Sequence, residues 1–196
     1  PNNPTGLLSS RDELRSLLPH LPGIVFVDEC YYELSGETLA DVVCAYPNLI
    51  LLRSLSKGFG LAGLRVGYAV ASEGLIDRMA RSALTFPVNC IAQAAALAAL
   101  EDRELYHERV RRLVIMREEL SEAFRAQGLE VLPSRTNFIM TFWPEGTSPA
   151  SHLAEKGIWV SDQTKALASS RPALRIAVGS EEENQILLGA VRDLCS

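Results

Sequence analysis

The chain has 196 residues, of which 47% are hydrophobic and 22% charged, and its formal net charge at pH 7 is −5. These are ordinary values for a soluble intracellular protein of one or two domains, and the acidic balance leaves no basic surface for a nucleic acid. The Ala-rich run 91–100 is far short of the roughly 20 apolar residues that cross a bilayer, so we expect a cytoplasmic protein without a membrane partner. The four cysteines show no CxxC pair or metal-ligand spacing, which favours reduced thiols and predicts no metal site.

The first predicted elements alternate between helix and strand. Residues 10–13 (Ser-Arg-Asp-Glu) have the pattern of a capping box and predict a helix that continues to about Leu21. A continuous apolar run from Gly23 ends in the acidic and aromatic turn 28–31, and a second apolar strand is expected at 49–53. Because continuous apolar strands are typical of parallel sheets, we expect the first strand to be buried on both faces.

The loop after the second strand carries the most informative residues. It combines Lys57 with the hydroxyls of Ser54 and Ser56, three glycines and the guanidinium of Arg65. A lysine amine can form a Schiff base with a carbonyl, while hydroxyls, backbone N–H groups and an arginine fork bind phosphate. Ligands of open α/β sheets bind at the carboxyl ends of strands, where the turn 28–31 would also lie. The pattern suggests pyridoxal phosphate, and the alternative is a glycine-rich surface loop with a solvated lysine.

The rest of the chain mixes strands and helices in a different order. A break at Phe86-Pro87 precedes a long helix at about 90–127, which Gly128 would end. Further strands are expected at 65–71, 130–132, 137–142, 158–161 and 173–178, and further helices at 72–84, at 148–156 and after a capping box at 180–183. This mixture indicates a second structural part after the long helix.

Five motifs occur in order along the chain. They are Asn-Pro-Thr-Gly at 3–6, Asp-Glu-Cys-Tyr at 28–31, Ser-Leu-Ser-Lys with Gly-Leu-Ala-Gly-Leu-Arg within 54–65, Thr-Asn-Phe at 136–138 and Leu-Arg-Ile-Ala-Val-Gly at 174–179. Each is weak alone, but the ordered set resembles the class I/II (fold type I) pyridoxal-phosphate aminotransferases, and within them the histidinol-phosphate aminotransferase branch. The resemblance covers essentially the whole chain yet begins in the middle of the family's large domain. We therefore expect a fragment that lacks the family's N-terminal part.

The resemblance and the order of the elements together predict an α/β fold in two parts. Residues 1–108 would form the C-terminal part of the cofactor-binding large domain, a mostly parallel sheet with flanking helices. Residues 109–196 would form a smaller α+β domain, and the helix at about 90–127 would join the two. The family is usually a homodimer, so a fragment would expose apolar surface, and we expect the isolated chain to self-associate or aggregate.

Three catalytic residues follow from the resemblance. Asp28 would pair with the pyridine nitrogen of the cofactor and keep it protonated. Tyr31, together with Asn3, would contact the phenolic oxygen of the cofactor. Lys57 would bind the aldehyde and, once the substrate amine displaces it, would move the proton as general base and acid. Considered singly, Asp28 would be interpreted as a turn cap and Tyr31 as a half-buried aromatic residue. Asn3 would be a turn residue before proline, and Lys57 a solvated lysine.

The remaining site residues would hold a phosphate and a carboxylate. By resemblance, Ser54, Ser56 and Arg65 bind the phosphate of the cofactor. Arg175 lies in the middle of an apolar strand, where an unpaired buried guanidinium is costly. It matches the family's arginine for the substrate carboxylate, and Asn3 would also contact the substrate.

The implied reaction moves an amino group from histidinol phosphate or a related amino acid to a 2-oxo acid such as 2-oxoglutarate, as in histidine biosynthesis. The histidinol-phosphate branch typically has Arg-Asp-Gln where this chain has Ser-Asp-Gln at 161–163. Ser161 offers one hydroxyl and no charge, so it should bind a substrate phosphate more weakly than the arginine does. Lys165 or Arg135 could supply the missing charge. Two alternatives stay open: a pyridoxal-phosphate decarboxylase or lyase of the threonine-phosphate decarboxylase type, and an inactive or cofactor-free fragment.

Overall fold

The computed structural model describes residues 1–195, which form two compact units. The first unit contains Pro1 and Ser9–Val110, and the second contains Asn2–Leu8 together with the chain from Arg111 onward. This division differs from the expected parts 1–108 and 109–196 because residues 2–8 cluster with the second unit. Each unit is described by itself below.

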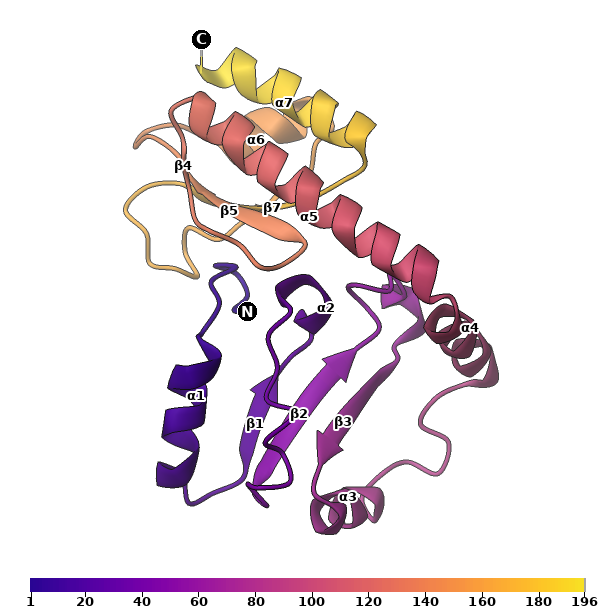
Figure 1. The fold of residues 1–196 in the computed structure, drawn as a ribbon. Coiled ribbons are helices and arrows are strands. Elements are labelled where there is room, and N and C mark those ends of the chain that lie inside the picture. Colours follow the sequence, from indigo (N-terminus) through magenta and orange to yellow (C-terminus); the bar gives the residue numbers. More distant parts are fainter. Residues whose placement is uncertain (196) are drawn as a thin grey trace. The chain divides into compact units, whose positions relative to one another are not determined.

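The first unit is built on a three-stranded sheet with the order β1-β2-β3 (Figure 1). Strand β1 (Val25–Asp28) pairs with β2 (Leu49–Ser54) in parallel, and β2 pairs with β3 (Gly67–Ala71) in antiparallel orientation. The α/β class is therefore confirmed, with a mixed sheet in this unit. Its helical elements are α1 (Arg11–Leu17), η1 (Leu18–His20), α2 (Tyr32–Ser35), η2 (Ala62–Leu64), α3 (Glu73–Ala80) and α4 (Cys90–Glu101).

Strand β1 is only partly buried, so the expectation that both of its faces are covered is wrong. Val25 and Val27 are half-buried, whereas Phe26 is 59% exposed and Ile24, just before the strand, is 57% exposed. Within the described chain β1 is an edge strand, because it pairs with β2 alone. A strand is buried on both faces only when helices cover both sides of the sheet. An apolar run in the sequence does not by itself guarantee that cover.

The expected capping boxes form at both predicted positions. At the start of α1 the Glu13 backbone N–H donates to Ser10 Oγ at 3.1 Å, and the Ser10 N–H donates to Glu13 Oε2 at 3.2 Å. At the start of α7 (Glu181–Cys195) Ser180 and Glu183 exchange the same pair of bonds, at 2.7 and 3.2 Å. Reciprocal bonds of this kind satisfy donors that a helix start would otherwise leave unpaired.

The single long helix expected at 90–127 is two helices, α4 and α5 (Arg103–Ala126). The break falls at Asp102, whose φ of −84° and ψ of 71° are not helical. Its side chain accepts a hydrogen bond from the backbone N–H of Leu105 at 3.1 Å, as an N-cap residue does. The surrounding residues 101–104, Glu-Asp-Arg-Glu, include neither glycine nor proline, so the break became visible only from the backbone. The end of α5 is as expected, because Gly128 follows it with a φ of 79°.

The second unit is a four-stranded antiparallel sheet with the order β4-β5-β7-β6. Its strands are β4 (Glu130–Val131), β5 (Phe138–Phe142), β6 (Ser161–Asp162) and β7 (Ala173–Ala177). Helix α7, helix α6 (Pro149–Glu155) and the second half of α5 lie on one side of this sheet (Figure 1). The core between them contains Phe124, Trp143, Leu153 and Val191.

Strand register decides which residues of this unit point away from the helices. Ile139 pairs with Ile176, and both belong to the core under the helices. Side chains alternate along a strand, so the next pair, Met140 and Arg175, faces the opposite side. Ser161 on β6 is also paired with Arg175 and shares that face. The sheet thus presents Arg175 between Met140 and Ser161.

Candidate active site

Two strand ends form the centre of the site in the first unit. Asp28 is the last residue of β1, and its register partner on β2 is Leu52, two residues before Ser54 ends that strand. Because the strands are parallel neighbours, the segments that follow them leave the sheet at the same edge. Asp28 Oδ1 accepts a hydrogen bond from the backbone N–H of Cys30 at 2.9 Å, which holds the turn after β1. The sequence prediction that two strands supply this edge agrees with the pairing.

The turn brings Tyr31 and Lys57 close to each other. Tyr31 precedes α2 and is 8% exposed, and Lys57 Nζ lies 5.6 Å from the centroid of its ring. The pKa of the Cys30 thiol responds both to Asp28 in this turn and to Lys57 in the loop after β2. Burial raises the pKa of Cys30 to about 12, a hydrogen bond and the charge of Asp28 add to the rise, and the charge of Lys57 opposes it. Asp28 and Lys57 therefore act on the same small region.

The loop that carries Lys57 closes back on itself. The backbone N–H of Leu55 donates to the carbonyl of Val66 at 3.1 Å, so the two ends of the loop lie side by side. This bond keeps Arg65 near the serines, and the N–H of Ser56 donates to Ser54 Oγ at 3.1 Å. Arg65 is exposed, has a left-handed φ of 56°, and donates from Nη1 to the carbonyl of Ala62 at 2.9 Å. The backbone of Arg65 and the two serines thus lie at the joined ends of one loop.

Gly58, directly after Lys57, is required by close packing. A Cβ atom at this position would lie 2.5 Å from Glu33 Cβ and 2.8 Å from Glu33 Cγ. Glu33 belongs to the short helix α2, and burial raises the pKa of its carboxyl group. The absence of a side chain at Gly58 lets α2 pack directly against the lysine loop, which holds Tyr31 and Lys57 together.

A buried ion pair behind the site was not foreseen from the sequence. Arg53 Nε lies 2.7 Å from Glu29 Oε2, and the two side chains are 8% and 6% exposed. Glu29 Oε1 also accepts from the backbone N–H of Leu39 at 2.8 Å, and the Arg53 guanidinium lies 3.5 Å from the ring centroid of Tyr32. Glu29 adjoins Asp28 and Arg53 adjoins Ser54. The only signal in the sequence is a charged residue at the end of each apolar strand.

In the second unit Asn3 and Arg175 contact each other. Arg175 Nη1 donates to Asn3 Oδ1 at 2.6 Å, although 172 positions separate the two residues. The guanidinium also lies 5.4 Å from the ring centroid of Phe138, within the range of a cation–π contact. Ser161, opposite Arg175, accepts a hydrogen bond from Gln163 Nε2 at 2.7 Å. The predicted substrate residues therefore form one pair, next to the serine that was expected to affect specificity.

The site residues divide between the two units. The first unit holds the predicted cofactor residues Asp28, Tyr31, Ser54, Ser56, Lys57 and Arg65, and the second holds Asn3 and Arg175. Within residues 1–195 no group of three or more His, Cys, Asp or Glu side chains is arranged to hold a metal ion. Over the same residues, no helix has the length and apolar character that crossing a bilayer requires.

The side chains of the site in the first unit are of the chemical types that pyridoxal phosphate requires. A lysine amine suits an aldehyde, a carboxylate suits a ring nitrogen that must stay protonated, and a phenol suits a phenolate oxygen. Hydroxyls and a guanidinium at one turn suit a phosphate. An α/β sheet with these groups at the carboxyl ends of two neighbouring strands defines a candidate pyridoxal-phosphate-dependent enzyme.

Comparison with known proteins gives the family. The family model described as aminotransferase class I and II matches residues 1–191, so the chain belongs to this family. A histidinol-phosphate aminotransferase of Thermoanaerobacter pseudethanolicus is 40% identical over 195 residues, which are 99% of this chain and 55% of that protein. The chain thus spans about half the length of the curated relatives it matches.

Two solved structures resemble the fold closely. The histidinol-phosphate aminotransferase from Sinorhizobium meliloti, in complex with pyridoxal-5'-phosphate, has a TM-score of 0.87 at 25% identity, covering 100% of this chain and 55% of that chain. A decarboxylase from Sulfurospirillum multivorans has a TM-score of 0.86 at 28% identity, covering 100% of this chain and 60% of that chain. The fold is therefore common to transaminating and decarboxylating proteins.

Proposed function

We propose that this chain carries the catalytic lysine and most of the cofactor contacts of a pyridoxal-phosphate-dependent aminotransferase. The observation that supports this most is the convergence of Asp28, Tyr31 and Lys57 at the ends of two parallel strands, with the Cys30 thiol under the influence of both charged groups. Membership of the class I and II aminotransferase family supports the same conclusion. The reaction would move an amino group from an amino donor to a 2-oxo acid such as 2-oxoglutarate.

Each residue at the strand ends has a defined task in this proposal. When bound, pyridoxal phosphate supplies an electron-poor ring that stabilises negative charge at the substrate carbon. Asp28 would keep a proton on the ring nitrogen, because a carboxylate favours the charged form of its partner. Tyr31 would donate to the phenolic oxygen. The amine of Lys57 would hold the aldehyde and then, freed by the substrate amine, carry the proton between two carbon atoms.

The serines, Arg65, Asn3 and Arg175 would position the two small molecules. Ser54, Ser56 and Arg65 would bind the phosphate, since they lie at the joined ends of one loop. Asn3 and Arg175, which we call the carboxylate clamp, would orient the substrate through its carboxylate. A guanidinium offers two parallel N–H donors to a carboxylate, which fixes orientation as well as affinity.

The amino donor depends on what lies beside the carboxylate clamp. Ser161 is the register partner of Arg175 and contributes a hydroxyl that already accepts a bond from Gln163. A charged hydrogen bond contributes about 1.5–3 kcal/mol, so a serine in place of an arginine weakens phosphate binding about tenfold or more. We therefore propose a related amino acid or amino alcohol as donor alongside histidinol phosphate. Comparing turnover of histidinol phosphate with that of aromatic and aliphatic amino acids decides between them, and a clear preference for the phosphate ester favours histidinol phosphate.

A decarboxylase is the second candidate, because the decarboxylase from Sulfurospirillum multivorans matches the whole of this chain in structure. Both reactions would use Asp28 and Lys57. They differ in product, since transamination yields an oxo compound and the pyridoxamine form of the cofactor, whereas decarboxylation releases carbon dioxide. Product analysis after a single turnover separates them.

The decisive experiment is cofactor attachment to the purified chain. Pyridoxal phosphate is added to the chain, the visible spectrum is recorded, and borohydride reduction is followed by peptide mapping. We expect a protein-bound absorbance band and a modified Lys57. The Lys57→Ala variant should lose both, while Lys156→Ala, which removes a lysine paired with Asp193, should keep them. The absence of a band, or equal labelling of Lys57→Ala, would support the alternative of a cofactor-free chain.

A further inference from the structure

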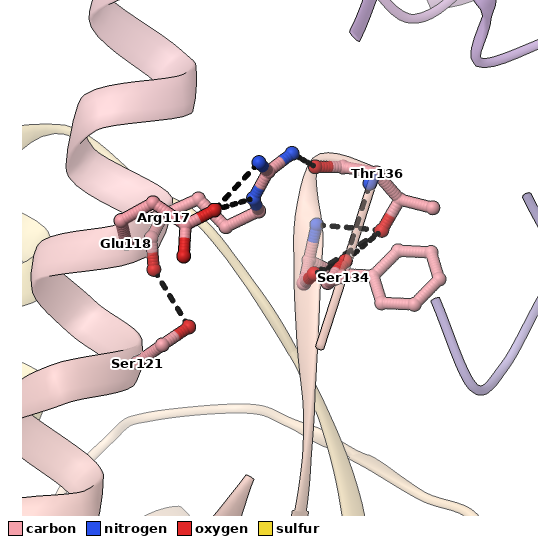
Figure 2. A network of polar contacts seen from close by, with 6 residues as sticks. Arg117, Glu118, Ser121, Ser134 and Thr136 are labelled. Atoms are coloured by element: carbon pink, nitrogen blue, oxygen red, sulfur yellow. Dashed lines mark hydrogen bonds and ion pairs between the residues drawn. The ribbon is translucent and has the colours of Figure 1, made fainter. Parts of the chain in front are cut away.

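A buried arginine in the second unit is bonded to the loop before β5. Arg117 lies in α5, its side chain is 1% exposed, and Nη1 donates to the carbonyl of Thr136 at 3.1 Å. The Nε and Nη2 atoms of Arg117 contact Glu118 Oε1 at 3.1 and 2.7 Å, as Figure 2 shows. Glu118 is 54% exposed, so it neutralises the charge of Arg117 while its own carboxylate stays in contact with solvent. A buried guanidinium is costly to desolvate, and here its donors are directed to one loop carbonyl and one carboxylate.

The loop that Arg117 holds, residues 134–138, is rigidified by its own hydroxyls. Ser134 Oγ and Thr136 Oγ1 lie 2.9 Å apart, and both donate to the carbonyl of Phe138, at 2.7 and 3.1 Å. The backbone N–H of Thr136 donates in turn to Ser134 Oγ at 3.2 Å. These groups are buried, where hydrogen bonds are stronger and an unpaired polar group is expensive. We call residues 134–138 the support loop.

The support loop contacts both segments of the carboxylate clamp. At one end, the ring of Phe138 lies 5.4 Å from the guanidinium of Arg175. At the other, the backbone N–H of Arg135 donates to the carbonyl of Gly6 at 3.0 Å. A Cβ atom at Gly6 would lie 2.6 Å from Ser134 Oγ, so the segment that carries Asn3 packs tightly on the loop. One loop thus contacts both the Asn3 segment and Arg175.

We propose that Arg117 is a positioning residue of the carboxylate clamp. It fixes the carbonyl of Thr136, and through the support loop it holds the Phe138 ring and the Asn3 segment where Arg175 can bind a carboxylate. The inference rests on the proposed function, in which Asn3 and Arg175 bind the substrate carboxylate. Arg117 itself is buried in α5 and acts through the support loop.

The first test measures 2-oxoglutarate binding to the purified chain without cofactor. Isothermal titration calorimetry, whose signal does not depend on the residue at position 175, gives dissociation constants for the wild-type chain and for Arg117→Met. We expect Arg117→Met to weaken binding about tenfold, as expected when a preorganised charged contact is lost. Arg112→Met is the matched control, because Arg112 is an exposed arginine of the same helix that pairs with Glu181. It should bind like the wild-type chain.

Arg117→Lys separates positioning from loss of the fold. Lysine keeps the charge beside Glu118 but lacks the fork that reaches both Glu118 and the carbonyl of Thr136. If circular dichroism shows that Arg117→Met does not fold, Arg117→Lys is used as the test variant in its place. We expect it to bind 2-oxoglutarate about threefold to tenfold more weakly than the wild-type chain. Wild-type affinity in a folded Arg117 variant would overturn the proposal.

A double-mutant cycle shows whether Arg117 acts through Arg175. In an Arg175→Gln background, Arg117→Met should have little further effect on the dissociation constant, because the clamp is already lost. Equal, additive effects in both backgrounds would mean that Arg117 supports only the fold. Failure of the proposed function looks different: Arg175→Gln would then bind 2-oxoglutarate as well as the wild-type chain does, whatever residue stands at position 117.

Discussion

At the scale of single residues, the Cys30 thiol reports on the proposed cofactor site. Its pKa is raised to about 12 by burial and by Asp28, and Lys57 opposes the rise. The thiolate is the reactive form, so only a very small fraction of Cys30 is reactive at pH 8. We expect iodoacetamide to label Cys30 far more slowly than the exposed Cys44, with a Cys30 rate that still increases above pH 10. Peptide mapping over pH 7–11 measures both rates.

Removing the lysine should change that rate in a defined direction. Lys57 lowers the pKa of Cys30, so Lys57→Ala should raise it further and slow the labelling, while Cys44 is unaffected. A Cys30 rate that levels off near pH 9 would show instead that burial slows access alone. In that case the inferred proximity of Asp28 and Lys57 would lose its electrostatic support.

Gly58 gives a second prediction for a single residue. In Gly58→Ala the new methyl group meets Glu33 Cβ at 2.5 Å, and a Cβ atom cannot rotate away as a side-chain tip can. We expect a loss of about 1–3 kcal/mol in the free energy of unfolding, as for other overpacked sites, together with weaker uptake of pyridoxal phosphate. Urea denaturation and absorbance measure the two effects.

The matched control is Gly63→Ala in the same loop. A Cβ atom at Gly63 meets nothing within 4 Å, and its backbone is not in the left-handed region. This variant should keep the wild-type urea midpoint and cofactor uptake. If Gly58→Ala behaves like Gly63→Ala, the packing of α2 against the lysine loop does not determine the position of Lys57.

At the scale of elements, the Glu29–Arg53 pair joins the ends of β1 and β2 to the segment that contains Leu39. Both side chains are nearly buried, and Arg53 Nη2 also donates to Thr38 Oγ1 at 2.8 Å. Removing one member of such a pair leaves an uncompensated buried charge. We expect Glu29→Ala to cost about 3–5 kcal/mol in the free energy of unfolding, measured by urea denaturation.

Two further variants test this explanation. A Glu29→Leu/Arg53→Met double variant should be more stable than Glu29→Ala, because it leaves no charge unpaired. Arg11→Ala, which breaks the exposed pair of Arg11 and Asp41, should cost less than about 1 kcal/mol. Equal costs for Glu29→Ala and Arg11→Ala would contradict a structural role for the buried pair.

At the scale of the whole molecule, the first unit exposes several large apolar side chains from one stretch of the chain. Four large apolar side chains within residues 84–97 are 59–90% exposed: Leu84, Phe86, Ile91 and Leu97. Large apolar side chains that are exposed in this way favour association. We expect light scattering to give a mass above the 21.4 kDa of one chain, and the mass to fall in a Phe86→Ser/Ile91→Ser variant.

The control for association removes apolar surface elsewhere. Leu17 is 52% exposed on α1, outside residues 84–97, and Leu17→Ser should leave the measured mass unchanged. A mass of one chain for the unmodified protein at high concentration would show that this surface does not drive self-association. The homodimer expected from the family resemblance would then lack support from this region.

Features that depend on neighbours in the sequence could be predicted from the sequence alone. The capping boxes at Ser10 and Ser180 need only residues three positions apart, and both form. The glycine after α5 and the pair of parallel strands before the lysine loop were also predictable, because they depend on local backbone preferences and on apolar runs. The ordered motifs identified the family by resemblance, and the family model supports that identification.

Only the tertiary structure decided which distant residues meet. The contact of Asn3 with Arg175, the Glu29–Arg53 pair and the bond from Arg117 to the support loop join residues that are 172, 24 and 19 positions apart. Partial exposure of β1 likewise depends on its neighbours in the sheet and not on its own composition. Contacts of this kind depend on register and packing, which no single segment encodes, whereas a helix cap is complete within one turn of the chain.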